Sequence, residues 1–155
     1  STAVATIVGQ NLGAKKPDRA EKAGWQVAMV GGLFTLVVGI VLFLGAERFS
    51  SLMSSDPVVI AYTTQYFQVV GLCQPFVALW LILFGAMQGA GYTYWPMWAS
   101  IVGLVLVRLP LAWFLTLKFN DGPLGCWLGV GFAAILLGIL ALWRYSTGVW
   151  KTQKV

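Results

Sequence analysis

The chain has 155 residues, of which 59% are apolar and only 10% are charged, a composition that excludes an ordinary soluble domain. The net charge of +5 could suggest nucleic acid, but the basic residues stand in short segments between apolar runs, so membrane topology explains them better. The sequence has no histidine and therefore lacks the commonest metal ligand and general base. Cys73 and Cys126 lie within or beside apolar runs, and we interpret both as free packing residues, with no pattern that supports a disulfide.

The first predicted helix covers about residues 1–13 and is too short to cross a bilayer. Its apolar run is about half of the ~20 residues that a spanning helix needs, and the chain starts with Ser, so we expect the end of a truncated helix. Gly13 can end this helix, and Pro17 suits the first turn of the next one. Asp18 can pair with Lys22 one turn further on.

Four longer helices are predicted to follow, over residues 17–46, 57–89, 94–118 and 123–146. Each contains an apolar run long enough for one crossing at about 1.5 Å per residue. The predicted crossings are Trp25–Ala46, about Ile60–Gln88, Trp95–Leu117 and Leu124–Trp143. Asp56 is the expected N-cap of the second, and residues 47–56 before it are interpreted as a short interfacial turn. The charge-free stretch from Pro57 to Val107 would extend roughly 75 Å as one helix, so it must fold back near the glycines at 89–91. The predicted fold class is all-α, a polytopic membrane helix bundle.

The distribution of bases predicts the orientation of these crossings. Lys and Arg are retained on the cytoplasmic side during membrane insertion. The segments assigned to the inside hold seven bases, and those assigned to the outside hold only Arg48 and Lys118. We therefore expect loop 15–22 and the tail after Arg144 to be cytoplasmic and residues 47–56 to be external.

Several segments, in this order, resemble the multidrug and toxic compound extrusion (MATE) transporters. They are Val8–Ala14 with Pro17–Ala20, Phe84–Gly91 with Trp95–Met97, Arg108–Pro110, Gly122–Gly125 and Gly148–Lys151. The resemblance covers the whole chain, which would be the portion from the end of the eighth helix through the twelfth, a partial C-terminal lobe of a twelve-helix transporter. Two departures stand out: Tyr92-Thr93 replaces a frequent Asp-Thr, and no acidic residue lies between Pro57 and Val107, which puts sodium coupling through this lobe in doubt.

The resemblance implies a secondary antiporter in the plasma (inner) membrane that exports drug-like or cationic organic compounds in exchange for H⁺ or Na⁺. It also implies a missing N-terminal lobe as partner. We expect no cofactor other than the coupling ion, which should bind in the missing N-terminal part, because no carboxylate lies within the predicted crossings of this chain. The alternative is a flippase for lipid-linked precursors, whose cavity should carry several bases. A membrane-embedded enzyme is the weakest hypothesis, because the predicted crossings hold no histidine or carboxylate.

Arg108 and two prolines are the first candidates for a functional site. Arg108 is the only charge inside a predicted crossing, roughly 15 Å from its outer boundary, and charges at that depth usually face a bundle interior or water. A structural role and a functional role are equally supported. Pro110 and Pro75 each release a backbone carbonyl, and broken helices often mark transporter binding sites, although a tolerated kink explains them as well.

Aromatic and amide side chains supply the other candidates. Phe76, Trp80, Phe84 and Gln88 recur every four residues, so they form one stripe that could stack on a drug, although a lipid-facing stripe is the simpler interpretation. Gln65 and Gln68 share another face and are expected to bond between helices more than to bind substrate. The loop motif Gly9, Gln10, Gly13 and Pro17 is interpreted as a helix corner.

Overall fold

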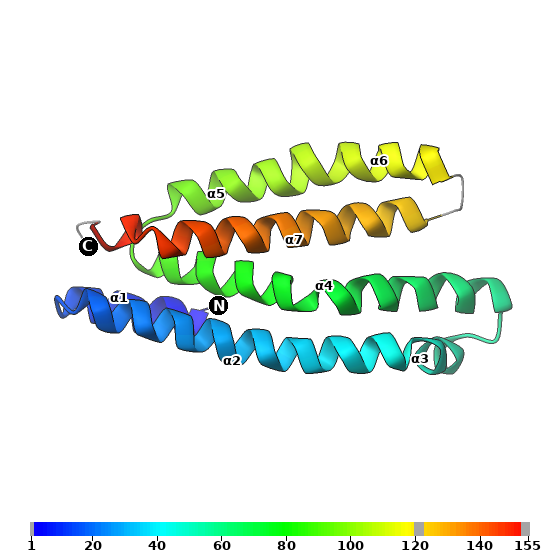
Figure 1. Cartoon of the computed structure of the whole chain (residues 1–155), viewed down its shortest axis with the longest axis horizontal. Coiled ribbons are helices and arrows are strands. Elements are labelled where there is room, and N and C mark those ends of the chain that lie inside the picture. Colours follow the sequence, from blue (N-terminus) through cyan, green and yellow to red (C-terminus); the bar gives the residue numbers. More distant parts are fainter. Residues whose placement is uncertain (1, 120–122, 153–155) are drawn as a thin grey trace.

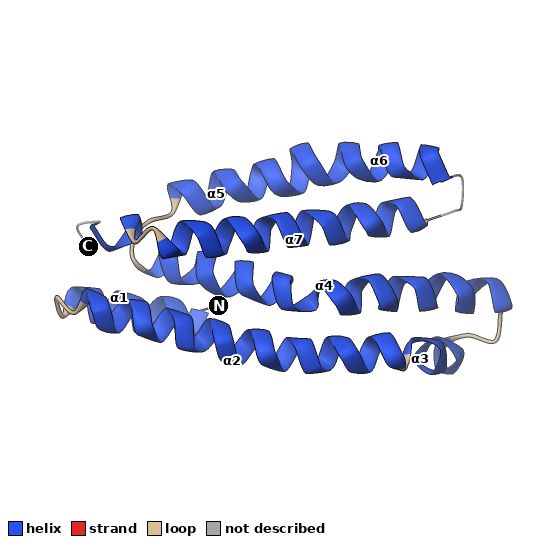
Figure 2. Cartoon of the chain, viewed as in Figure 1, coloured by secondary structure: helices blue, strands red, loops and turns tan. Residues whose placement is uncertain are grey.

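The computed structural model describes residues 2–119 and 123–152, and in that part of the chain all regular structure is helical (Figures 1 and 2). The elements are α1 (Thr2–Gly13), α2 (Pro17–Leu44), α3 (Ala46–Met53), α4 (Pro57–Gly89), α5 (Tyr94–Ile101), a π-helical segment (Val102–Val107), α6 (Arg108–Phe119), α7 (Leu124–Ser146) and a 3₁₀ turn (Val149–Thr152). Four stretches of these helices are long and apolar enough to cross a membrane, as the sequence predicted.

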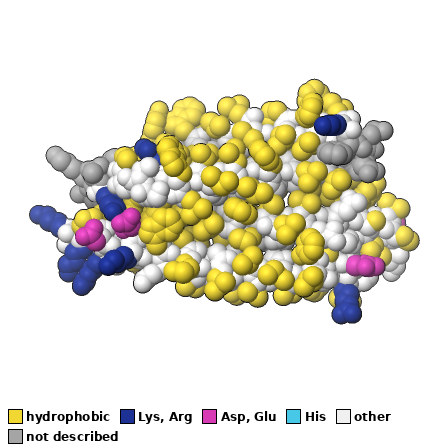
Figure 3. All heavy atoms as spheres, viewed as in Figure 1, with side chains coloured by type: hydrophobic (Ala, Val, Ile, Leu, Met, Phe, Trp, Pro, Cys, Tyr) yellow, Lys and Arg dark blue, Asp and Glu magenta, His cyan; other side chains and the backbone are white. Residues whose placement is uncertain are grey.

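The long helices run side by side, and short segments close the bundle at two ends (Figure 1). One end holds the corner between α1 and α2, the turn between α4 and α5, and the tail after α7; we call it the basic end. The other, which we call the far end, holds α3, the last turn of α6 and the first turn of α7. Charged side chains gather at the two ends, and hydrophobic side chains cover the face between them (Figure 3).

The corner between α1 and α2 forms where the sequence placed it. Helix α1 ends at Gly13, Lys15 adopts a positive φ of 56°, and Pro17 is the first residue of α2. The expected pair between Asp18 and Lys22 is not formed, since the ion pair found among the described residues joins Lys151 and Glu21. Asp18 and Lys22 are both exposed, and an exposed pair gains too little to hold two side chains together.

Residues 47–56 are not simply a turn, and that prediction was wrong. Helix α2 ends at Leu44, and after Gly45 the chain forms the short amphipathic helix α3. It buries Ala46 and Ser50 one turn apart, and the Ser50 hydroxyl donates a 2.8 Å hydrogen bond to the Ala46 carbonyl. Asp56 caps α4 as expected, because its side chain accepts a 2.8 Å bond from the Val58 amide.

The third crossing is interrupted rather than uniformly α-helical. Between α5 and α6 the segment Val102–Val107 winds as a π-helix, and the amide of Arg108 bonds the carbonyl of Gly103, five residues back. Pro110 lies just beyond and has no amide hydrogen to offer the carbonyl of Leu106. The local break that we expected at Pro110 therefore takes the form of a widened turn that ends at Arg108.

Helix α4 is the centre of the bundle, because it packs on α1, α2, α3 and α7. Its contact with α2 relies on two glycines, since a Cβ on Gly39 would lie 2.2 Å from the carbonyl oxygen of Gly71. Pro75 lies within α4, which continues past it as one helix. The buried residues of α4 concentrate at 83–87, so the tightest part of the core lies toward the basic end.

Candidate functional site

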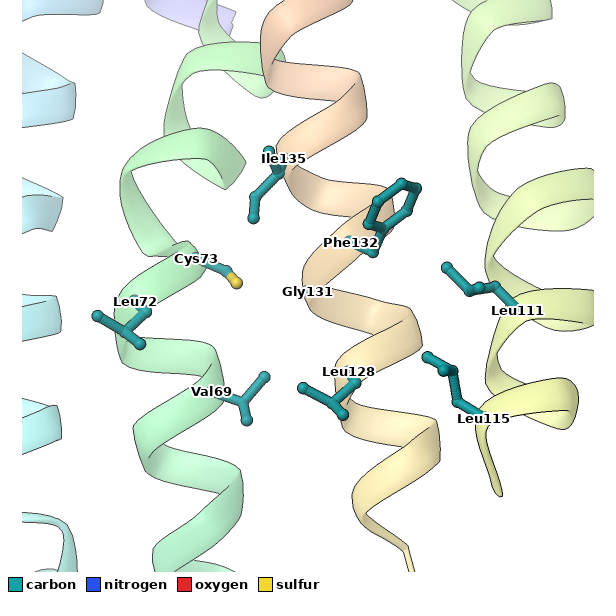
Figure 4. Close-up of a pocket in the computed structure, with 9 residues that line it drawn as sticks. All are labelled: Val69, Leu72, Cys73, Leu111, Leu115, Leu128, Gly131, Phe132 and Ile135. Carbon is teal, nitrogen blue, oxygen red and sulfur yellow. The ribbon is translucent and has the colours of Figure 1, made fainter. Parts of the chain in front are cut away.

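An apolar pocket lies between α4, α6 and α7 (Figure 4). Its volume is 530 Å³, and only apolar side chains, one thiol and one glycine line it: Val69, Leu72, Cys73, Leu111, Leu115, Leu128, Gly131, Phe132 and Ile135. Gly131 brings α7 close to α4, since a Cβ there would lie 2.8 Å from the Cys73 sulfur. Such walls can hold a hydrophobic molecule, and they offer no group for acid–base chemistry at neutral pH.

None of the residues predicted for a substrate cavity lines this pocket. Arg108 shares a face of α6 with the lining residues Leu111 and Leu115, at spacings of three and seven residues, and Phe76 has the same spacings from Cys73 and Val69 on α4. The Arg108 side chain is half-buried and has no hydrogen bond or ion pair with the residues that the structure describes. The site therefore offers one guanidinium on the side of α6 that bears the pocket, one turn away from it.

The aromatic stripe on α4 packs largely against the protein itself. Phe76 faces α7, where a Cβ on Gly138 would meet it at 3.0 Å. The rings of Trp80 and Phe84 meet edge to face at 5.8 Å, and Phe84 meets Trp95 in the same way at 5.7 Å. Phe84 is only 2% exposed, so in this arrangement its ring has almost no surface for a ligand. Gln88, at the end of the stripe, is exposed.

The amides on α4 do not make the interhelical bonds that we expected. The Gln65 carbonyl oxygen and the neighbouring Thr64 hydroxyl are buried without a hydrogen-bond partner among the described residues. Gln68 is half-buried and likewise has no side-chain bond there. The far half of α4 thus carries polar atoms that the described part of the chain leaves unsatisfied, whereas no such atom is found in its closely packed half.

The loop motif has a packing role. A Cβ on Gly9 would lie 2.9 Å from the carbonyl oxygen of Gly89, so the glycine lets α1 approach α4. Gln10 is exposed, and Gly13 and Pro17 form the corner described above. Asn11 bonds the Ile7 carbonyl within its own helix at 2.8 Å, so it does not bridge helices.

Sequence reasoning missed an aromatic cluster at the basic end. Tyr145, at the end of α7, is fully buried, and its ring stacks on Trp150 with centroids 4.7 Å apart. The Trp150 indole donates a 3.0 Å bond to the Tyr145 carbonyl, and Trp25 meets Tyr145 edge to face at 5.2 Å. The tail returns on itself at Gly148, whose φ is +67°. That glycine, in the run Gly148-Val-Trp-Lys151, is the pattern that could have predicted the cluster.

Two charged contacts complete this cluster, which we call the tail clamp (Glu21, Trp25, Arg144, Tyr145, Trp150 and Lys151). The Lys151 ammonium lies 2.5 Å from the Glu21 carboxylate at the start of α2. The Arg144 guanidinium donates to the Tyr92 hydroxyl and lies 5.3 Å and 5.5 Å from the ring centroids of Tyr92 and Trp95. The clamp therefore joins the tail to the start of α2 and α7 to the turn after α4.

Nothing in the described ranges, 2–119 and 123–152, groups three acidic, cysteine or histidine residues closely enough to hold a metal ion. Both cysteines are free, with Cys73 buried and Cys126 exposed. The Cys126 sulfur lies 3.5 Å from the Thr116 hydroxyl, so it packs between α6 and α7 on the surface.

The comparisons with known proteins agree with one another. The sequence model of the MatE family matches residues 1–114. The chain is 30% identical over its whole length to the probable multidrug resistance protein NorM of Thermotoga maritima and covers 33% of that protein. It is 27% identical to the protein DETOXIFICATION 14 of Arabidopsis thaliana, with 97% of this chain and 31% of that protein covered.

A solved structure shares the fold. The MATE transporter ClbM, in a complex with Rb⁺, superposes with a TM-score of 0.86 over 99% of this chain and 36% of that one, at 22% sequence identity. The chain thus spans about a third of the length of the relatives that it matches, the share expected of a partial lobe.

Proposed function

Because this chain belongs to the MatE family, whose relatives here are transporters and not enzymes, we propose that it forms part of a secondary antiporter for drug-like or cationic organic compounds. The main support for this proposal is the match of residues 1–114 to the MatE family. The counter-ion is H⁺ or Na⁺, the protein lies in the plasma (inner) membrane, and the tail clamp faces the cytoplasm. The substrate passes between this lobe and a second lobe outside the chain.

The chemistry of the pocket supports a hydrophobic organic substrate. Its walls are apolar in all three helices, so they favour aromatic and aliphatic groups over charged headgroups (Figure 4). A flippase for anionic lipid-linked precursors would require several bases around its cavity, and the described pocket is lined by none. Arg108 supplies one guanidinium on the same face of α6 as Leu111 and Leu115, a turn before the pocket.

Ion coupling requires a group that changes its charge or its bound ion during the cycle, usually a carboxylate or histidine within a crossing. The carboxylates of this chain all stand near helix ends or in connections: Asp18, Glu21, Glu47, Asp56 and Asp121, the last of which lies outside the described residues. We therefore place the coupling carboxylate in the other lobe, and this chain supplies cavity walls.

Efflux of a fluorescent cationic drug from vesicles, driven by a pH or sodium gradient, tests this assignment in the full-length gene product. Each of D18N, E21Q, E47Q, D56N and D121N should leave ion-driven efflux within about twofold of the parent, because the sequence places each of them outside the predicted crossings. A variant that inserts correctly and binds drug normally, but no longer responds to the ion gradient, contradicts it.

Labelling of single cysteines tests the orientation, in a background without Cys73 and Cys126. A cysteine at position 19 should react with an impermeant maleimide only after the membrane is opened, whereas one at position 51, in α3, should react from outside. Strong external labelling at position 19 reverses the proposed topology.

A further inference from the structure

The exposed face of α2 joins basic residues directly to an apolar surface that the other described helices leave uncovered. Arg19 and Lys22 are exposed, and the residues that continue their face at spacings of three and four are exposed as well. The apolar members of this α2 stripe are Met29, Val30, Leu33, Val37, Ile40 and Leu44, with exposures from 49% to 78%. The opposite face of α2 carries Ala20, Gly24, Ala28 and Gly39, which are all buried.

The spacing along α2 matches the layers of a bilayer. Lys22 and Met29 are seven residues apart, about 10 Å along the helix axis, with Gln26 between them. The polar headgroup layer extends roughly 5–8 Å beyond the hydrocarbon on each side. When the α2 stripe faces hydrocarbon with Met29 at its edge, the backbone of Lys22 lies about 10 Å and that of Arg19 about 15 Å beyond this edge, just outside the headgroup layer. Their long side chains can reach back to the depth of the phosphates.

The bases at this corner form no ion pair with an acid of the described chain, so they can bind an external partner. Among the described residues the one carboxylate held in an ion pair is Glu21, which binds Lys151 on another side of α2. Asp18 is the acid nearest to Arg19 and Lys22, and it forms no ion pair with either within 4.0 Å. Lys15 and Lys16 add two further exposed bases beside it, so this surface stays strongly positive (Figure 3).

We propose that Arg19 and Lys22, together with the α2 stripe, bind an anionic phospholipid whose phosphate lies between the two bases and whose acyl chain follows the stripe. Membrane insertion alone requires only that bases lie somewhere in this loop. Insertion does not require that two of these bases lie on the same helix face as the apolar residues of a crossing. Such an arrangement can bind the headgroup of a lipid with the bases and its acyl chain with the apolar face. Attraction to an anionic leaflet grows with each base near the surface.

Native mass spectrometry of the full-length gene product tests the proposal. The protein is first stripped of lipid and then given equal amounts of phosphatidylglycerol and phosphatidylcholine. The parent protein should retain phosphatidylglycerol preferentially. R19Q/K22Q should lower its affinity for that lipid by about tenfold and leave phosphatidylcholine unchanged. Glycerol phosphate in excess should not displace the lipid, because it lacks the chain that covers the stripe.

The matched control is K15Q/K16Q, which removes the same charge from the same corner but not from the stripe, and should lower the affinity by about twofold or less. R19K/K22R keeps both charges and should retain the lipid, which separates lipid binding from a folding defect. The proposal fails if the parent protein holds both lipids equally, if the two Gln pairs weaken binding equally, or if glycerol phosphate competes fully.

Discussion

The basic end and the far end of this bundle are built differently. At the basic end the aromatic rings of Tyr145 and Trp150 are buried, and charged contacts join the tail to α2 and α7 to the turn after α4. In the far half of α4, Thr64 and Gln65 have buried oxygens without partners in the described chain, whereas the one such atom described at the basic end is Nε of Arg144, whose guanidinium is held by the Tyr92 hydroxyl through another nitrogen. The difference teaches that this chain is held together near its basic end and leaves surface for other contacts toward its far end.

The largest expected effect comes from removing the ring at the centre of the tail clamp. Y145A should lower the stability of the purified protein by about 3 kcal/mol, because it leaves a cavity between Trp25 and Trp150. F132A removes a ring that is 54% exposed at the pocket and should cost less than about 1 kcal/mol. Thermal unfolding in detergent measures both. Equal losses of stability in Y145A and F132A would show that the two ends do not differ in packing.

A second test adds atoms instead of removing them. In G24A the new Cβ would lie 1.9 Å from the Tyr145 hydroxyl, and the stacked ring cannot move without disturbing Trp150, so we expect a loss of about 2 kcal/mol. G32A, two turns further along α2, meets nothing closer than 3.7 Å. It should be neutral or gain about 0.5 kcal/mol, since alanine is the better helix former. Denaturation midpoints that rank the other way would contradict the packing described here.

The contact of Arg144 with the turn after α4 should contribute less. R144Q loses the charge over the rings of Tyr92 and Trp95, and we expect a loss of about 1 kcal/mol. R144K keeps the charge but not the planar group and should fall between the parent and R144Q. R48Q, on the exposed side of α3, serves as the control, and a midpoint for R144Q that matches it would show that the contact does not stabilise the fold.

The smallest effect is predicted for the ion pair between Lys151 and Glu21. Both side chains are partly exposed, at 25% and 29%, so a double-mutant cycle with K151Q and E21Q should give a coupling of about 0.5 kcal/mol. The coupling should shrink in 1 M salt. The same cycle with K22Q in place of K151Q should give none. A coupling that survives high salt would show that the pair is more deeply shielded than its exposure indicates.

The sequence by itself determined the membrane class, the four crossings and their approximate limits, because long apolar runs bounded by Pro, Gly and charge leave few other arrangements. The corner at Gly13 and Pro17 and the cap at Asp56 were predictable for the same local reason. Helix α3 was missed, although Ala46 and Ser50 are spaced as one buried helix face, because eight residues carry too weak a pattern to stand out from a turn.

Only the tertiary structure decided which side chains meet. The aromatic stripe on α4 gave no sign that Phe84 would be buried against Trp95, since a period of four shows that residues share a face and not what covers it. The pocket between α4, α6 and α7 depends on three helices far apart in the sequence, and the tail clamp joins Glu21 to Lys151 across almost the whole chain. Contacts of that range follow from how the helices pack, which local hydrophobicity does not encode.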